Sequence, residues 1–388
     1  MLNQPKIRRL LFQLVLLLAV ILFAAWIWHN TALNLGKRGQ DISFAFLHHP
    51  ANFPIDQALI PYAQSDSYLR VFWVGLMNTL LVSVLAAVSA TLIGTLVGIL
   101  RLSPNWLIQK IMAAFVEVFR NIPLLLQLFF WYFAVLAVLP APRASTWVIG
   151  CDDTKSCLLA LNNRGLSLAA PHADALLYTT LALAAGGLLL SFFIHRLNRR
   201  RQRKSGQIFS LWWLYLLLIA VLPLTFYVLR MTGDNYHLPT LQGFNYRGGL
   251  TVLPELAALW IALTLYSAAY IAEYVRAGIQ SVPRGQYEAA ASIGLSGAQA
   301  MRLVILPQAL RIIVPPLTNQ YLNIVKNSSL AAAIAYPDLV SVFTGTALNQ
   351  TGRAIEIIAL TMLVYLTISL IISLLMNLYH HHIRLVEK

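Results

Sequence analysis

The chain has 388 residues, of which 59% are hydrophobic and only 11% are charged, and its formal net charge is +14. Soluble globular proteins carry roughly 25% charged residues, so this composition excludes a soluble enzyme, a disordered chain and a small disulfide-built secreted domain. The Lys and Arg residues lie mainly between apolar stretches, so the positive charge does not indicate a nucleic-acid-binding protein.

Eight apolar stretches are each long enough to cross a bilayer, which takes about 20 helical residues. We therefore predict an all-α integral membrane protein with about eight transmembrane helices. The second, third and sixth stretches exceed one crossing, so we expect them to tilt, kink or extend past the membrane. The stretches cover residues 10–28, 71–100, 111–139, 176–195, 209–229, 254–280, 312–335 and 355–379.

The distribution of basic residues predicts the topology. With an even number of crossings, 17 of the 28 Lys and Arg residues fall on the side of the N-terminus and nine on the opposite side. The positive-inside rule then places both termini in the cytoplasm. The first stretch resembles a signal peptide in following basic residues, but no small-residue cleavage site closes it. We therefore expect a retained helix.

Cys151 and Cys157 are the only cysteines, and both fall in the predicted outer loop after the third crossing. A disulfide between them fits an oxidising compartment, whereas the spacing alone leaves two unpaired thiols as an alternative. No nearby cysteine or histidine supplies further zinc ligands, so no metal site is expected. The basic run at residues 196–204 is interpreted as a topology anchor that contacts anionic lipid headgroups.

The polar stretch after the sixth crossing carries the strongest pattern. Residues 282–286 predict a turn, and residues 287–293 are strong helix formers. Gly294 is expected to close that helix as a C-cap, and Ser296 to N-cap a second helix that ends at Leu306-Pro307. Small alanines on one side of this helix-turn-helix element would allow another protein to approach closely.

Here the sequence resembles a known family. Glu288-Ala289-Ala290, three residues, Gly294, nine residues and then Val304-Ile305-Leu306-Pro307 is similar to the EAA motif in the membrane subunits of ABC importers, with Val304 where isoleucine is usual. Three further stretches resemble the polar-amino-acid permease branch of that family. They are Gly75-Leu76 with Asn78-Thr79-Leu80, residues 117–127, and Lys326-Asn327-Ser328-Ser329-Leu330.

The resemblance implies a type I ABC importer permease core in two parts. An N-terminal helix and outer loop precede the core, and an insertion with an outer loop and two extra helices interrupts it. This long form resembles the membrane subunits of general L-amino-acid importers. The expected segments are residues 1–70, the core parts 71–139 and 254–388, the insertion 140–253, and a cytoplasmic coupling segment at 281–311.

The sequence has no Gly-x-x-x-x-Gly-Lys-Ser/Thr phosphate loop, so ATP must be bound elsewhere. The resemblance implies a non-catalytic permease subunit in a bacterial inner membrane that binds no cofactor itself. ATP and Mg²⁺ would be bound by a cytoplasmic ABC ATPase dimer. The further partners implied are a second permease subunit, expected to be a relative in a heterodimer, a periplasmic substrate-binding protein and an L-amino acid.

Two groups of residues are predicted to act in transport. The resemblance assigns ATPase coupling to Glu288, Ala289, Ala290, Gly294, Leu306 and Pro307. Polar side chains within crossings are costly in lipid, which makes Glu117, Arg120, Asn319, Asn323 and Lys326 candidates for the substrate pathway. Interhelical hydrogen bonding explains each of these singly, and an intrachain pair of Glu117 with Lys326 would explain those two without substrate.

Two other classes of protein remain as alternatives. A stand-alone ion-coupled secondary transporter would show inverted repeats and broken helices, and the sequence shows no matching halves and only one strong break, at Pro315-Pro316. A membrane enzyme would need a cluster of catalytic or metal-binding residues. No such cluster is apparent in the sequence.

Overall fold

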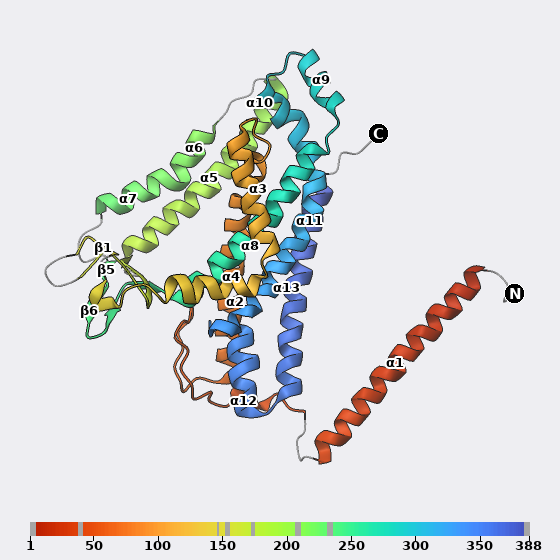
Figure 1. Ribbon diagram of the computed structural model, residues 1–388, viewed down its shortest axis with the longest axis vertical. Coiled ribbons are helices and arrows are strands. Elements are labelled where there is room, and N and C mark those ends of the chain that lie inside the picture. Colours follow the sequence, from red (N-terminus) through yellow and green to blue (C-terminus); the bar gives the residue numbers. More distant parts are fainter. Residues whose placement is uncertain are drawn as a thin grey trace. The chain divides into compact units, whose positions relative to one another are not determined.

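The computed structural model describes residues 5–37, 42–145, 147–151, 156–171, 175–205, 211–230 and 236–383. Basic residues of the predicted topology that lie outside these ranges include Arg38, Lys155, Arg384 and Lys388. Within the described residues, seven helices are long and apolar enough to cross a membrane, and the count is eight if a bent helix pair is taken as one span (Figure 1). The prediction of a helical membrane protein with about eight spans is confirmed.

The chain divides into two compact units, and the first comprises residues 1–84 and 278–388. It contains α1 (Pro5–Lys37), the 3₁₀ turn η1 (Ala45–His48) and the start of α2 (Tyr68–Leu100). After residue 278 it holds the elements that carry the predicted coupling segment and the last two crossings. These are α9 (Arg284–Ser292), α10 (Gly297–Ala300), η6 (Met301–Ile305), α11 (Leu306–Asn327), η7 (Ser328–Ile334), η8 (Val340–Ala347), α12 (Leu348–Thr351) and α13 (Ala354–Ile383).

Close packing joins the start of α2 to the segment around η8. A Cβ placed on Gly75 would lie 2.7 Å from Val342 Cγ2 and 2.9 Å from Leu339 Cα, so only glycine permits this approach. Asn78 is fully buried and donates to the Pro337 carbonyl at 2.8 Å. The apolar core of this unit is therefore supplemented by hydrogen bonds to buried backbone, which a membrane interior requires.

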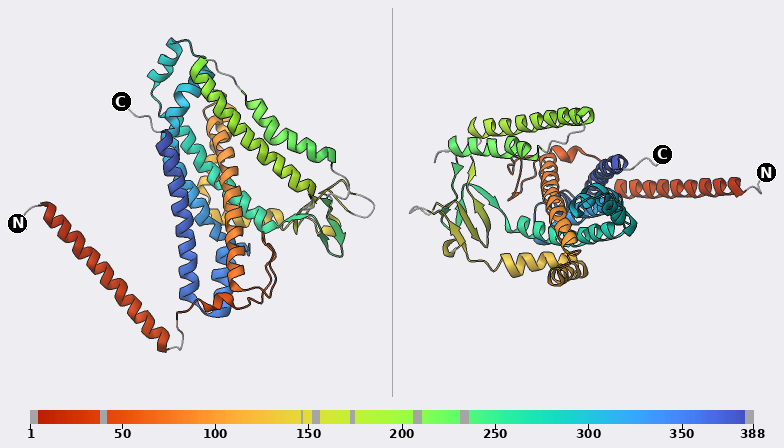
Figure 2. Two further views of the ribbon diagram at one scale, coloured as in Figure 1. Left: turned by 180° about the vertical axis from the view of Figure 1, so that it is seen from behind. Right: turned by 90° about the horizontal axis from the view of Figure 1, so that it is seen from above.

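The second unit comprises residues 85–277. It holds the rest of α2, most of α8 (Pro254–Gln280) and the whole of the predicted insertion. Within it α5 and α7 run side by side (Figures 1 and 2). Its other elements are α3 (Trp106–Asn121), α4 (Leu124–Phe129), η2 (Phe130–Leu136), η3 (Pro142–Ala144), α5 (Ala175–Ser205), α6 (Trp212–Leu216), η4 (Leu217–Val221) and α7 (Leu222–Arg230).

Small residues hold α2 against α8. A Cβ on Gly94 would lie 2.7 Å from the Ala268 carbonyl oxygen, and one on Gly98 would lie 2.7 Å from that of Ala272. Small residues at this four-residue spacing let membrane helices approach closely enough for backbone contact. The pair therefore forms a rigid support for the residues at the end of α8.

The third predicted crossing is a broken helix pair rather than one straight helix. Residues 106–121 and 124–136 meet at an angle of 104°. Ile122 has an extended backbone (φ −92°, ψ 128°) because it precedes Pro123, and a residue before proline avoids the helical region. The prediction that Pro315-Pro316 is the only strong break was wrong, since both prolines lie inside the continuous helix α11.

Eight short strands fold the outer loops of the insertion into a small β-domain, which the sequence did not predict. Four antiparallel strands form a sheet in the order β1-β2-β3-β8, and β4-β5 and β6-β7 form two further pairs. Cys157, Ala160 and Tyr246 make its buried core. The strands are β1 (Trp147–Ile149), β2 (Leu159–Asn162), β3 (Gly165–Leu168), β4 (Ala170–Pro171), β5 (Tyr236–His237), β6 (Thr240–Gln242), β7 (Asn245–Arg247) and β8 (Leu250–Val252).

Candidate functional site

The predicted coupling segment begins with α9, which ends in a Schellman motif. Gly294 has φ +76°, its N–H donates to Ala291 O at 2.9 Å, and the N–H of Leu295 donates to Ala290 O at 3.1 Å. This left-handed cap satisfies carbonyls at the helix end and turns the chain sharply. Gly294 is therefore the C-cap that the sequence predicted, and the turn requires a residue that tolerates positive φ.

The second helix starts at the predicted N-cap. Ser296 Oγ accepts from the Gln299 N–H at 3.4 Å, and Gln299 Oε1 accepts from the Ser296 N–H at 2.9 Å, which completes a capping box. The prediction that Leu306-Pro307 ends this helix was wrong. A π-helical turn at Met301–Ile305 leads directly into α11, and Pro307 occupies its first turn, where a missing N–H costs little.

Hydrogen bonds and close packing attach α9 to the rest of its unit. The Gln308 side chain donates to Gln286 Oε1 at 3.2 Å and to Val304 O at 3.0 Å. Just before α9 in the chain, a Cβ on Gly278 would lie 2.3 Å from Ile313 Cγ1, so the end of α8 packs directly on α11. The α9 helix is therefore attached to α11, and the last turn of α8 packs against the same helix.

The residues exposed on the outer surface of this segment are only partly those that we expected. Glu288 and Ala289 are exposed, but Ala290 is 2% exposed and packs within the chain. The expectation that both alanines face a partner was therefore wrong for Ala290. Ile293, which the motif comparison did not single out, is 75% exposed. An exposed isoleucine between a helix and its cap is a natural contact for another protein.

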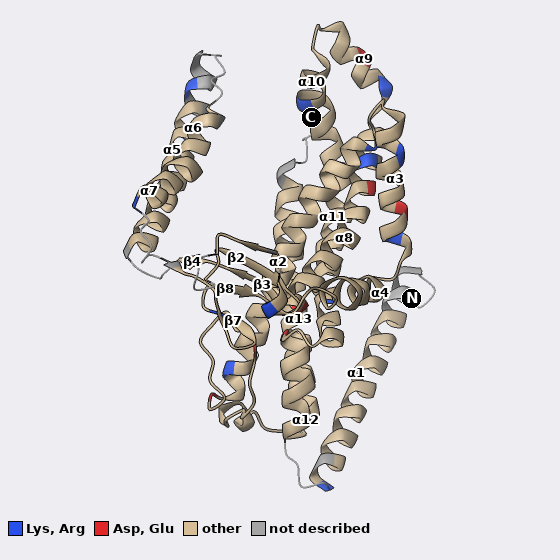
Figure 3. Cartoon of the chain, turned by 60° about the vertical axis from the view of Figure 1, so that its left-hand side comes forward, with Lys and Arg blue, Asp and Glu red and all other residues tan. Residues whose placement is uncertain are grey.

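A cluster of charges lies in the second unit where α3 approaches α8 (Figure 3). Glu273 accepts hydrogen bonds from Arg101 and Arg276, and Arg120 lies 4.0 Å from the same carboxylate. The Arg120 guanidinium also stacks 5.1 Å from the centroid of the Tyr270 ring. Three arginines thus share one carboxylate, which leaves the cluster positively charged.

This cluster lines a cavity of about 340 Å³. Two residues predicted for the substrate pathway, Glu117 and Arg120, are on its wall. Glu273 and Arg101 were not among the predicted pathway residues, because the topology placed them on the cytoplasmic side. The spacing of Glu273 and Arg276 by three residues within an otherwise apolar helix was the signal that could have found them. The complete lining is Arg101, Val116, Glu117, Arg120, Asn121, Glu273 and Arg276.

The other three predicted pathway residues lie in the first unit. Asn319, Asn323 and Lys326 are all exposed on α11. Their spacing of four and three residues puts them on one face of the helix, whereas Gln320 is buried at 2% exposure. We call Asn319, Asn323 and Lys326 the polar stripe. Lys326 belongs to the first unit and Glu117 to the second.

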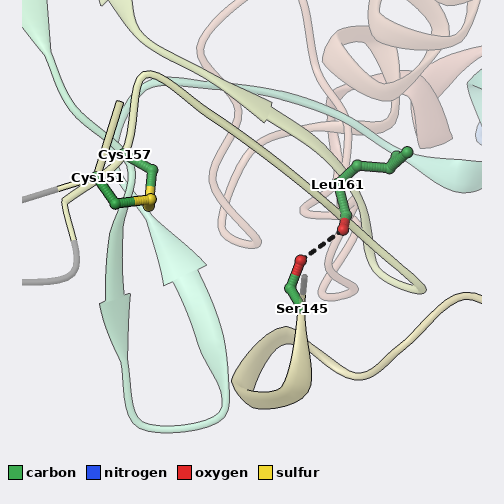
Figure 4. Close-up of a disulfide and its surroundings, with 4 residues drawn as sticks. All are labelled: Ser145, Cys151, Cys157 and Leu161. Carbon is green, nitrogen blue, oxygen red and sulfur yellow. Dashed lines mark hydrogen bonds between the residues drawn. A yellow bond between two sulfur atoms is a disulfide. The ribbon is translucent and has the colours of Figure 1, made fainter. Parts of the chain in front are cut away.

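Near the start of the insertion, the structure joins Cys151 to Cys157 in a disulfide within the β-domain (Figure 4). Cys157 is 1% exposed and belongs to the buried core of that domain. Ser145 donates to the Leu161 carbonyl at 2.7 Å nearby. The bond therefore ties Cys151 to the β-domain core, and neither cysteine lines the charged cavity.

Comparison with known proteins places these features in one family. The family model of binding-protein-dependent transport system inner membrane components matches residues 90–385. The chain is 52% identical to the "Putative amino-acid ABC transporter permease protein YhdX" of Escherichia coli K12, over 99% of this chain and 96% of that protein.

Two further relatives cover the whole chain. It is 45% identical to the general L-amino acid transport system permease protein AapQ of Rhizobium johnstonii, over 99% of this chain and 94% of that protein. It is 42% identical to the glutamate/glutamine/aspartate/asparagine transport system permease protein BztB of Rhodobacter capsulatus, over 99% of this chain and 95% of that protein.

Proposed function

The chain belongs to the family of binding-protein-dependent transport system inner membrane components, and from this premise we propose that it is a permease subunit of an ATP-driven importer for L-amino acids. It forms part of the translocation pathway in a bacterial inner membrane, with both termini in the cytoplasm. It catalyses no reaction and binds no cofactor. A second, related permease completes the pathway, and a periplasmic binding protein delivers the amino acid.

The observation that carries this proposal is the exposed, rigidly capped segment from α9 to η6. Glu288, Ala289 and Ile293 present one charged and two apolar groups at α9 and its C-terminal end, which is capped at Gly294 next to a second helix capped at Ser296. A separate cytoplasmic ATPase dimer, which binds ATP and Mg²⁺, docks on this surface. Closure of the dimer moves α9, and with it α8 and α11, between inward-facing and outward-facing states.

The polar stripe and the charged cavity are the proposed substrate pathway. An exposed Lys326 with two asparagines would be costly against lipid, so this face of α11 turns toward water or the second permease. An amino acid carries a carboxylate and an ammonium group that both need compensation away from bulk water. The three arginines of the cavity suit the carboxylate, and Glu117 suits the ammonium group.

The experiment is to tag this chain, extract it in mild detergent from its native membrane, identify the copurifying proteins by mass spectrometry, and reconstitute the sample in vesicles. We expect an ATPase subunit and a second permease, together with amino-acid uptake that requires ATP. Recovery of the chain alone, with uptake driven by an ion gradient in the absence of ATP, would instead establish the secondary transporter. Chemical change of the substrate would establish the membrane enzyme.

A further inference from the structure

The β6–β7 hairpin carries an exposed aromatic side chain at its turn. Gly243 has φ +64° and Phe244 follows it, so the two-residue loop presents Phe244 outward with 70% of the residue exposed. A single exposed phenylalanine is unremarkable on its own. This one is held in place by a second element, which sets it apart from a loose loop residue.

Arg143 from η3 fixes the position of this phenylalanine. Its Nε donates to the Gly243 carbonyl at 2.8 Å, and its guanidinium carbon lies 4.1 Å from the centroid of the Phe244 ring. The two residues are 101 positions apart in the sequence, so the fold of the β-domain brings them together. Arg143 and Phe244 are both exposed. Because the hydrogen bond and the ring contact hold them together, the pair is ordered before a partner binds.

Among the residues that the structure describes, the charged side chains of the β-domain are all arginines. The described residues of the β-domain, within 140–171 and 236–253, include the exposed Arg143, Arg164 and Arg247 and no aspartate or glutamate. Arg247 lies on β7 of the same hairpin and pairs with Thr240 of β6. A complementary surface therefore carries carboxylates around an apolar recess that accepts an aromatic ring.

The position in the chain identifies the compartment. β8 ends at Val252 and α8 begins at Pro254, while the coupling segment follows the other end of α8. A helix of 27 residues is about 40 Å long, which is enough to cross a bilayer, and the predicted topology puts the segment before this helix outside the cytoplasm. Its disulfide fits the oxidising conditions outside the cytoplasm.

From these observations we propose that Arg143 and Phe244, at the tip of the β6–β7 hairpin, form a docking point for the extracytoplasmic binding protein. The inference rests on the proposed function, because it takes the soluble partner from the importer. Arginine and aromatic residues dominate the binding energy of protein interfaces, and a pair that is already ordered loses less entropy on binding. The tip lies on the far side of the small sheets from α5 and α7 (Figure 1), which favours a soluble protein over lipid.

The test uses the complete transporter reconstituted in vesicles and its purified binding protein loaded with amino acid. The half-saturating concentration of binding protein for stimulated ATP hydrolysis is measured separately from the maximal rate. We expect Phe244→Ala and Arg143→Gln each to raise the half-saturating concentration about tenfold with little change in the maximal rate. Phe244→Tyr should restore binding, and Arg230→Gln, an exposed arginine at the end of α7 and outside the β-domain, is the matched control.

The outcomes separate the two levels of the proposal. If wild-type complex responds to the binding protein and Phe244→Ala responds with the same half-saturation, the docking point is wrong and the importer stands. If no ATPase assembles with the wild-type chain, the importer itself fails. The measurement is repeated with and without anionic phosphatidylglycerol. If the loss of ATPase stimulation in Phe244→Ala depends on phosphatidylglycerol and not on the concentration of binding protein, the hairpin tip contacts the membrane surface. That result would overturn the inference.

Discussion

The last strand of the β-domain precedes α8 in the sequence, and the coupling segment follows α8. The two exposed surfaces are built in different ways. The coupling segment is shaped by local sequence, since a Schellman glycine and a capping box set its two turns. The β-domain is shaped by distant pairings, such as Leu166 with Val252 and Arg143 with Gly243. A locally determined surface is sensitive to single cap residues, whereas a surface made by long-range pairing depends on the whole small domain.

The largest effect is expected at the cap of α9. Gly294→Trp forces a bulky residue into φ +76°, although open space surrounds the position, so the damage comes from backbone strain. We expect ATP-driven uptake to fall by about tenfold or more, since one turn of the docking surface is misplaced. Uptake in vesicles and membrane insertion are measured together.

Gly285→Ala is the matched control for this variant. Gly285 lies inside α9 with negative φ and nothing within 4 Å of an added Cβ, so alanine should leave uptake unchanged. Gly294→Asn should retain more uptake than Gly294→Trp, because asparagine tolerates the left-handed conformation. Normal uptake by the tryptophan variant at normal expression would show that the cap does not position the docking surface.

A smaller effect should separate the two neighbouring alanines. Ala290→Leu places extra carbons in a buried position and should lower the stability of the chain by about 1–3 kcal/mol. Ala289→Leu, at an exposed position, should leave stability unchanged and weaken only the association with the ATPase. Thermal unfolding of the chain without ATPase distinguishes them, and equal losses of stability would contradict the observed burial.

The β-domain should respond less sharply to loss of its disulfide. Replacing Cys151 and Cys157 by serine opens a short loop, which should destabilise that domain by about 2 kcal/mol. Uptake should fall only at low concentrations of binding protein, while ATPase association is retained. Limited proteolysis of the insertion provides the readout. Loss of ATPase binding in this variant would mean that the two surfaces are not independent.

The prediction farthest from either surface is a pH dependence of stability. Asp338 is fully buried, and burial raises the pKa of its carboxyl from 3.8 to about 7. Because the folded state then holds a proton that the unfolded state releases, stability should fall as pH rises between these two values. Asp338→Asn keeps an oxygen for the Ser341 N–H and should flatten this slope in unfolding measurements. An unchanged slope would assign the dependence to other groups.

Features set by nearby residues could be predicted from the sequence. Hydropathy gave the eight spans, and Gly294 and Ser296 marked the caps. The sequence could not show that the helix breaks at Pro123 and continues through Pro315-Pro316. A membrane helix tolerates proline when neighbouring groups satisfy the freed carbonyls, and those neighbours are known only in the folded chain. The π-helical turn before Pro307 likewise has no simple sequence signal.

Contacts between distant residues were beyond prediction. Arg101 and Glu273 are 172 residues apart, and their pairing depends on how α2 and α8 pack through Gly94 and Gly98. The strands of the β-domain are two to four residues long, which is too short for an alternating pattern to appear. The charged cavity and the hairpin tip therefore emerge only once the chain is folded.

The most direct test of the account is a cysteine cross-link between α9 and the ATPase. Both native cysteines are bonded to each other, so a cysteine replacing Ile293 is the only free thiol, and Phe244→Cys on the hairpin is the control. With an ATPase that carries a thiol-reactive probe, we predict that Ile293→Cys forms a cross-link whose yield changes with ATP, and that Phe244→Cys forms none. Absence of the Ile293 cross-link in complexes that still import amino acids with ATP would contradict the central claim.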